Sequence, residues 1–398
     1  MKMKKFIWAG CLAYLLIGLA HVIVGSVLED LLHHYGKVYS DGGVLIFLQF
    51  SGFLLGVLSG PWWSRRLGRR GTIILALACL SAAQVLYSFL PDWSLLLVAA
   101  PFAGYGFGMV EAIIGAIVIE FAKSGAVAMT RLEVFFGLGA MLMPAVASIL
   151  IGLDLWRLSF PLIAGISVLC LLLFSFMSFG QTDALLAKPM LGGEELTENQ
   201  PSSYGGSKKW VLFILAAFFL LYVGIEMSFV NFLPSILIDK LNVSTATGAA
   251  AVSFFWASMS VGRLFAGSVA ERSGYARYLG VSSFGAVAVF ILFYLADGFT
   301  VSFFMILLMG LLMSGIFAIG LIFANQVLPG NTERTTSLLI ASGGIGGAIL
   351  PLFTGYAMDR FTSGVSVVVL ASLMGLMALL LVAAVKASTR RTLSVEKF

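Results

Sequence analysis

The chain has 398 residues, of which 60% are hydrophobic and 11% are charged. Soluble globular proteins usually carry about 25% charged residues, so this composition excludes an ordinary soluble protein. The formal net charge of +5 does not indicate nucleic-acid binding, because the basic residues are concentrated in short segments between apolar ones. No spacing typical of a zinc site, a nucleotide loop or a catalytic triad is present, so we predict that the protein is not an enzyme.

Twelve membrane-spanning helices are predicted, because the apolar segments have about the 20 residues that cross a bilayer. In chain order they cover residues 6–28, 42–63, 72–90, 94–121, 131–153, 157–179, 209–236, 248–270, 277–296, 300–325, 335–357 and 364–387. The polar segment 180–208 follows the sixth of these helices and has the composition of a linker. We therefore predict an all-α integral membrane protein with two six-helix halves, residues 1–179 and 209–398, joined by a cytoplasmic linker.

The distribution of lysine and arginine predicts the orientation, since these residues are more frequent in cytoplasmic segments. With the N-terminus inside, 20 of the 24 Lys and Arg residues fall in inner segments, and Arg263 is counted among them. We therefore expect both termini to be cytoplasmic. The acidic residues near the outer helix ends, Asp239, Asp297 and Asp359, are expected to be solvated loop charges.

Two charged turns lie between long apolar segments, 207 residues apart, and indicate a duplicated architecture. The residues singled out are Gly60, Arg65, Gly68 and Arg69 in the first turn and Gly267, Glu271, Arg272, Gly274 and Arg277 in the second. The first glycine of each turn would let two helices approach closely, and the charges would bind each other, nearby carboxylates or helix ends. We interpret the two turns as an inner gate. The alternative is that their charges only set the topology.

These turns resemble the signature of loops 2–3 and 8–9 in the major facilitator superfamily, and the helix count, linker and repeat agree with it. The resemblance implies two pseudo-symmetric halves that alternately expose a central site. The second turn fits the signature, whereas the first lacks the acidic residue. We therefore expect the charge lock of the first turn either to be weaker or to depend on Glu120 or Glu133. Within the superfamily, segments 48–58, 132–140, 224–226, 231–236 and 253–256 resemble the fucose/glucose permease branch, including its bacterial glucose/mannose:H+ symporters.

Glu111 is an ionisable residue well inside the fourth predicted helix, where a charge costs roughly 2.5–3.5 kcal/mol and usually has a function. It shares a helical stripe with Gly104, Gly108 and Gly115, so it can meet a neighbouring helix or water. In the permease branch that this segment resembles, a glutamate on helix 4 is implied in proton coupling. We expect Glu111 and His21 to couple protons. The alternatives are a structural carboxylate and an interhelical hydrogen bond by the histidine.

Polar and aromatic side chains inside the spans are candidates for substrate binding, because sugar hydroxyls need hydrogen-bond donors and acceptors together. The candidates are Gln49, Glu226, Asn231, Trp256 and Asn325. Pro234 disturbs the backbone of the helix that carries Glu226 and Asn231, as in the broken helices that often line transporter sites. The alternative is that these groups only tie helices together.

The resemblance implies a proton-coupled importer of a hexose such as glucose or mannose that works by alternating access. Fucose members of the branch carry an aspartate on helix 1 and an asparagine on helix 5, where this chain has Gly25 and Phe136, so fucose itself is not expected. The alternatives are an H+-antiporting exporter of drugs or metabolites and a membrane receptor on a transporter fold. We expect a monomer in a bacterial cytoplasmic membrane, with a proton as the coupling ion, no metal, no other cofactor and no nucleic-acid partner.

Overall fold

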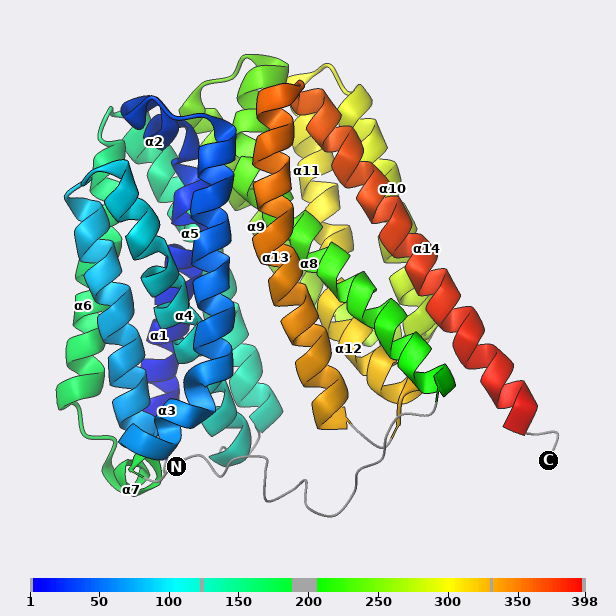
Figure 1. The fold of residues 1–398 in the computed structure, drawn as a ribbon, viewed down its shortest axis with the longest axis horizontal. Helices are drawn as coiled ribbons and strands as arrows, with labels where there is room; N and C mark the ends of the chain where they lie inside the picture. The colour runs from blue at the N-terminus through cyan, green and yellow to red at the C-terminus, as the bar shows by residue number, and fades with distance from the viewer. Residues whose placement is uncertain (1–2, 122–124, 188–205, 330–331, 396–398) are drawn as a thin grey trace.

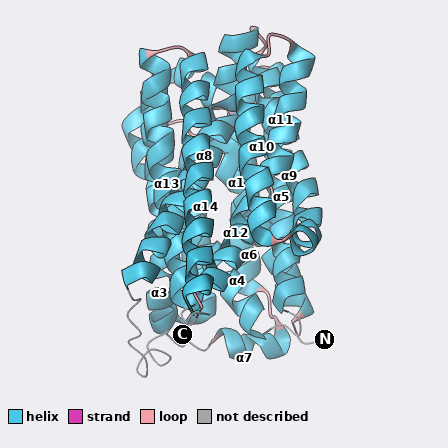
Figure 2. Ribbon diagram, turned by 90° about the vertical axis from the view of Figure 1, so that its right-hand side faces the viewer, coloured by secondary structure: helices cyan, strands magenta, loops and turns pink. Residues whose placement is uncertain are grey.

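The computed structural model describes the chain except residues 1–2, 122–124, 188–205, 330–331 and 396–398, and the described part is helical without strands. The first half contains α1 (Lys4–Ser26), α2 (Leu28–Tyr35), α3 (Tyr39–Ser88), α4 (Trp93–Phe121), α5 (Gly125–Gly152) and α6 (Ser159–Phe176). The second half contains α8 (Gly206–Leu241), α9 (Thr245–Ser273), α10 (Tyr275–Leu295), α11 (Phe299–Met313), α12 (Ile316–Val327), α13 (Thr332–Arg360) and α14 (Ser363–Val395). Figure 2 shows the same bundle from the side, and the predicted fold class is confirmed.

Helix α3 accounts for two of the predicted spans. Its 50 residues would extend about 75 Å as an α-helix, more than twice the roughly 30 Å thickness of the hydrocarbon layer. Gly68 interrupts it with φ 71° and ψ 169°, a conformation that glycine adopts readily because it has no Cβ. Eleven helices of the described part are long and apolar enough to cross a membrane. Counting α3 twice gives the twelve predicted spans.

Two of the predicted helices are broken in the structure. The first predicted helix, 6–28, corresponds to α1, which ends at Ser26. The short helix α2 follows it, with its leucines buried and its acidic residues partly exposed. The tenth predicted helix, 300–325, is divided into α11 and α12 at Gly315, where the Tyr278 hydroxyl lies in the space that a Cβ would need. Neither break carries a proline, so neither is visible in the apolar pattern of the sequence.

The beginning of the predicted linker is folded into a 3-10 turn (Gly180–Thr182) and the short helix α7 (Asp183–Leu186). Arg70 anchors it to α6 by donating to three carbonyl oxygens near the C-terminal end of that helix, those of Phe174, Ser175 and Met177. Arg70 also pairs with Asp183 at 3.2 Å. Burial raises the pKa of Asp183, but the Ser178 hydroxyl, backbone N–H groups and Arg70 lower it overall. Residues 188–205, most of the predicted linker, lie outside the described part.

The two halves lie side by side, and α1 begins at the same end of the bundle at which α14 ends (Figure 1). We call this the terminal end and the opposite one the distal end. The halves meet through the pairs α3–α13, α5–α9 and α1–α8. All hydrogen bonds that join the halves between described residues lie from the middle of the bundle to the distal end. Towards the terminal end the helices of the two halves diverge (Figure 1).

Candidate functional site

Four charged side chains from both halves lie within electrostatic range of one another inside the spans. Arg263 of α9 acts on Glu111 of α4, Glu133 of α5 and Glu226 of α8. We call these four residues the charge cluster. Glu226 is only 6% exposed, whereas the side chain of Arg263 is exposed between carboxylates of both halves. Because intramembrane charges are costly and normally face the interior of a bundle, this arrangement indicates a functional site.

The carboxylate of Glu111 is free of hydrogen bonds to the described residues. The Tyr14 hydroxyl donates to the main-chain carbonyl oxygen of Glu111 at 2.9 Å, so this bond does not involve the carboxylate of Glu111. The predicted stripe of glycines on α4 meets a neighbouring helix, because Gly104 and Gly108 pack against the backbone of α3. These contacts fix the position of α4, which carries Glu111.

Trp256 of α9 lies next to the charge cluster and has an unpaired donor. The central guanidinium carbon of Arg263 lies 5.9 Å from the centre of the Trp256 indole ring. The side chain is 1% exposed, and its indole Nε1 has no hydrogen-bond partner in the described part of the chain. Leaving a buried donor unpaired costs about 1–3 kcal/mol, so such a group usually has a ligand or an ordered water as its partner. The structure therefore brings together two of the predicted substrate-binding residues, Trp256 and Glu226, through Arg263.

Asn231 and Gln49 are both buried, with 3% of each side chain exposed. The Asn231 amide donates to the carbonyl oxygen of Met227 at 2.8 Å, so one of its two N–H donors is used within α8. Its other side, the Oδ1 atom, lies 2.6 Å from the place that a Cβ on Gly25 would occupy. Asn231 thus fills the space in front of Gly25, which explains physically why no side chain stands at the position where the fucose members carry aspartate.

Replacing Gly25 by alanine is expected to destabilise the protein by about 1–3 kcal/mol, the usual range for overpacking. The added Cβ would lie 2.7 Å from the Asn231 Cα, which is main chain and can retreat only if α1 and α8 separate. The thermal midpoint of the purified protein in detergent measures the effect. Gly165→Ala is the matched control, because no atom lies within 4 Å of its added Cβ in the described structure. Equal midpoints for the two variants would contradict this account of the α1–α8 contact.

His21 lies in an apolar cage. Its ring packs edge-on against Phe50, Phe107 and Phe136, with centroid distances of 5.2–5.6 Å. Its Nε2 atom lies 3.2 Å from the sulfur of Met227 in the other half. No hydrogen bond or ion pair links His21 to an acidic residue in the described part of the chain, so the geometry favours the packing alternative over proton transfer.

Asn325 lies apart from the other predicted substrate-binding residues. Its amide donates to the Leu321 carbonyl oxygen at 3.0 Å and to the Thr336 hydroxyl at 2.9 Å, so it ties α12 to α13. These bonds are typical of an interhelical tie, the alternative that the sequence left open. The geometry does not join Asn325 to the charge cluster.

The sequence did not indicate Arg263 as a site residue, yet it interacts with all three carboxylates of the charge cluster. The topology count placed it in an inner segment, but it lies inside α9, seven residues after Trp256. Glu133, which the sequence indicated only as a possible acid for the first charged turn, interacts instead with Glu111 and Arg263. The sequence feature that could have revealed Arg263 is a cation in an otherwise apolar span, because such a charge normally pairs with a carboxylate on another helix.

Glu120 supplies the acidic partner that the first charged turn lacks, and it is one of the two residues that the sequence indicated for this role. Arg69 is 2% exposed and binds both oxygens of Glu120, at 2.8 and 3.1 Å. Its guanidinium also lies 4.6 Å from the ring centre of Phe121. Gly60 packs closely on Ile113, and Gly68 takes the turn conformation with positive φ. Arg65 is exposed and takes part in a further interaction.

The second charged turn has the same backbone geometry without the same contacts. Gly274 has φ 87°, which matches Gly68 in the first turn. The charges of the turn, Glu271, Arg272 and Arg277, are exposed and form no ion pair with described residues. The close helix approach predicted at Gly267 is wrong for this structure, because no described atom lies within 4 Å of its Cβ position.

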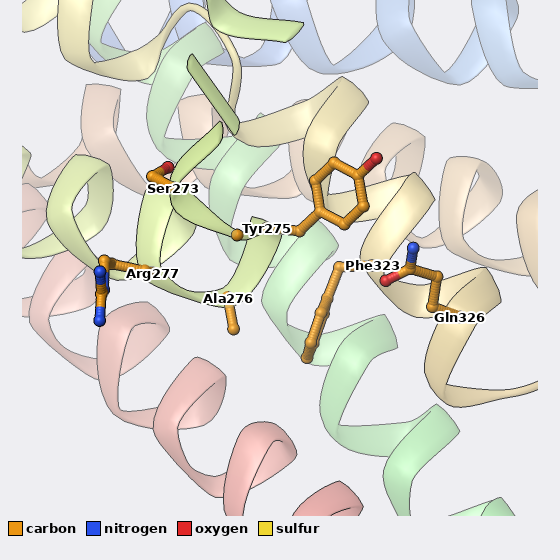
Figure 3. Close-up of a pocket in the computed structure, with 7 residues that line it drawn as sticks. Ser273, Tyr275, Ala276, Arg277, Phe323 and Gln326 are labelled. Carbon is orange, nitrogen blue, oxygen red and sulfur yellow. The ribbon is translucent and has the colours of Figure 1, made fainter. Parts of the chain in front are cut away.

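A cavity of about 520 Å³ lies beside this turn (Figure 3). Tyr275 and Phe323 project into the region between the start of α10 and α12, and Gln326 borders it from α12. The second turn is therefore less closely packed than the first.

Comparison with known proteins identifies the family. The family model described as Major Facilitator Superfamily matches residues 10–184 and 212–397. The chain belongs to the major facilitator superfamily. The glucose/mannose transporter GlcP of Bacillus subtilis (strain 168) is 32% identical over 357 residues, which cover 87% of this chain and 86% of that protein. Bypass of stop codon protein 6 of Saccharomyces cerevisiae is 23% identical over 389 residues, with 88% and 76% covered.

Solved structures of this superfamily have the same fold. The D-xylose-proton symporter aligns with a TM-score of 0.77 and 13% identity, covering 96% of this chain and 97% of that one. The peptide transporter POT in complex with sulfate aligns with a TM-score of 0.78 and 12% identity, covering 97% and 94%. Since a sugar symporter and a peptide transporter match equally well, the fold alone does not identify the cargo.

Proposed function

We propose that this membrane transporter imports a hexose such as glucose or mannose together with a proton. The observation that supports a hexose as the substrate is the 32% identity to a glucose/mannose transporter along most of both chains. The local chemistry supports it: Glu226 offers acceptors, while Arg263 and the unpaired indole N–H of Trp256 offer donors. A hexose needs both kinds of group and an aromatic face.

Proton coupling is assigned to Glu111 within the charge cluster. Three ionised carboxylates around one arginine leave a net negative charge inside the spans, which opposes closure of the site from water. A proton on Glu111 reduces that charge and favours a closed, sugar-loaded state. Release of the proton on the other side restores the attraction between Arg263 of the second half and the acidic residues of the first.

The transport cycle is proposed to proceed by alternating access. With both termini on the cytoplasmic side, the present arrangement is the inward-open state, because the halves are hydrogen-bonded distally and diverge at the terminal end. In the outward-open state the charged turns would come together and engage Glu271 and Arg272. The protein would work as a monomer in a bacterial cytoplasmic membrane, with no cofactor other than the coupled proton.

The test is uptake of labelled glucose and mannose by proteoliposomes with and without an imposed inward proton gradient. We expect the gradient to drive accumulation and a protonophore to abolish it. The transporter fold also suits an H+-antiporting exporter, so vesicles of inverted orientation are tested for proton-driven dye movement in parallel. Dye movement without uptake or binding of any hexose would replace the sugar assignment by export.

A further inference from the structure

The first turn of α3 is capped by a residue from the other half of the protein. The backbone N–H groups of Tyr39 and Ser40 donate to the two oxygens of Asp359, at 2.8 and 2.7 Å. Asp359 lies in the last turn of α13, 320 residues further along the chain than Tyr39. The first N–H groups of a helix have no partner within it, and the helix dipole favours a negative charge there. Asp359 is exposed, as the sequence suggested, but it lies in a helix and caps α3 instead of standing free in a loop.

A second carboxylate completes this contact from the opposite direction. Glu29 of α2, in the first half, accepts a hydrogen bond from the hydroxyl of Ser235 on α8 at 2.7 Å. It also accepts one from the Tyr39 hydroxyl at 3.1 Å. Tyr39 thus connects the two carboxylates, through its main chain to Asp359 and through its side chain to Glu29. We call Glu29, Tyr39, Ser235 and Asp359 the distal clasp.

Close backbone packing surrounds the distal clasp. A Cβ on Gly355 of α13 would collide with the Tyr39 carbonyl oxygen, and one on Gly43 of α3 would lie 3.0 Å from the Pro351 carbonyl oxygen. Small residues let the backbones of two helices approach closely, as they do here. The hydrogen bonds of the clasp lie beside this contact at the distal end of α3 and α13.

The exposure of the clasp suits a contact that has to open. Asp359 is exposed, so water can replace its two hydrogen bonds when the halves separate. Hydrogen bonds to charged groups are stronger than those between neutral groups, but they contribute less where water competes for them. A contact of this strength holds one state of a two-state equilibrium without making the other state inaccessible.

We propose that the distal clasp is the latch of the distal gate, which holds the two halves closed in this state and breaks when the opposite state forms. The latch deepens the proposed function, because it presumes alternating access, but it does not depend on the cargo. Asp359 and Glu29 are positioning residues, since they act on the relation between the halves and touch no transported molecule.

The test measures opening of the distal end without any sugar. A cysteine is introduced at Leu352, which lies against Gly43 at the α3–α13 contact, and the native cysteines Cys11, Cys79 and Cys170 are replaced by alanine. The rate of reaction with a water-soluble maleimide is followed in detergent, where the reagent reaches both ends. We expect Asp359→Asn and Ser235→Ala to raise this rate about tenfold, equivalent to the loss of one charge-assisted hydrogen bond.

Asp297→Asn is the matched control, because this exposed acid lies in the α10–α11 connection and makes no hydrogen bond to described residues. Its labelling rate should equal that of the parent protein. Ser235→Ala removes a single hydroxyl, so it tests the latch even if the charge variants fold poorly. Unchanged labelling in folded Asp359→Asn and Ser235→Ala proteins would overturn the latch. Failure of hexose uptake in proteoliposomes would instead overturn the cargo and leave the labelling result intact.

Discussion

Glu111→Gln is expected to reduce the accumulation ratio of the sugar to about 1, the value at equilibrium for transport without a coupled ion. Glutamine keeps the size and polarity of the side chain but cannot bind and release a proton. Exchange of labelled for unlabelled sugar across the membrane should persist, because binding and alternation do not require net proton movement. Accumulation and exchange measured in the same proteoliposomes separate the two effects.

Asp92→Asn is the control for this experiment, since it also removes one carboxylate but lies in the exposed connection between α3 and α4. We expect it to accumulate sugar like the wild type. The assignment of proton coupling to Glu111 is wrong if Glu111→Gln still concentrates sugar against its gradient. In that case Glu133, which faces the same arginine, becomes the candidate.

Arg263→Ala is expected to lower the transport rate roughly 30-fold, equivalent to about 2 kcal/mol. Removing one member of a buried ion pair costs about 3–5 kcal/mol. The side chain of Arg263 is exposed between the halves, so screening by water places the expected cost below that range. The effect arises because Glu111, Glu133 and Glu226 would lose the cation that compensates their repulsion.

Arg263→Lys separates charge from geometry. Lysine keeps the positive charge but lacks the planar fork that can serve several carboxylates and lie over an aromatic ring. We expect the transport rate of Arg263→Lys to lie at least about halfway, on a logarithmic scale, between the rates of Arg263→Ala and the wild type. Arg157→Ala, which removes an exposed arginine beside Trp156, should transport normally. Wild-type transport by Arg263→Ala would exclude the charge cluster from the mechanism.

The sequence indicated the two charged turns because their residues lie close together in the chain and the pattern occurs twice. Gly68 and Gly274 take positive φ values at equivalent points of the two turns. The missing acid of the first turn was expected to be replaced from helix 4 or 5, and Glu120 on α4 pairs with Arg69. The different packing of the two turns could not be predicted, because it depends on the conformational state of the whole bundle.

Inside the spans, residue type alone did not separate functional from structural groups. His21 has a suitable pKa in water, but its surroundings are three phenylalanines and a methionine sulfur. Arg263 was taken as a topological charge, yet it faces carboxylates of both halves. Each outcome depends on which faces of two helices are turned towards each other, and periodicity within one helix does not contain that information.

The apolar pattern of the sequence is enough to predict the membrane spans and their number. This follows because a bilayer requires each crossing segment to satisfy its backbone hydrogen bonds internally, which ties span length to a local run of apolar residues. Only the tertiary structure decided the partners of the charges. The bond between Tyr39 and Asp359 joins residues 320 positions apart, and the charge cluster draws on four helices. Such contacts depend on the packing of whole helices, which local hydropathy does not encode.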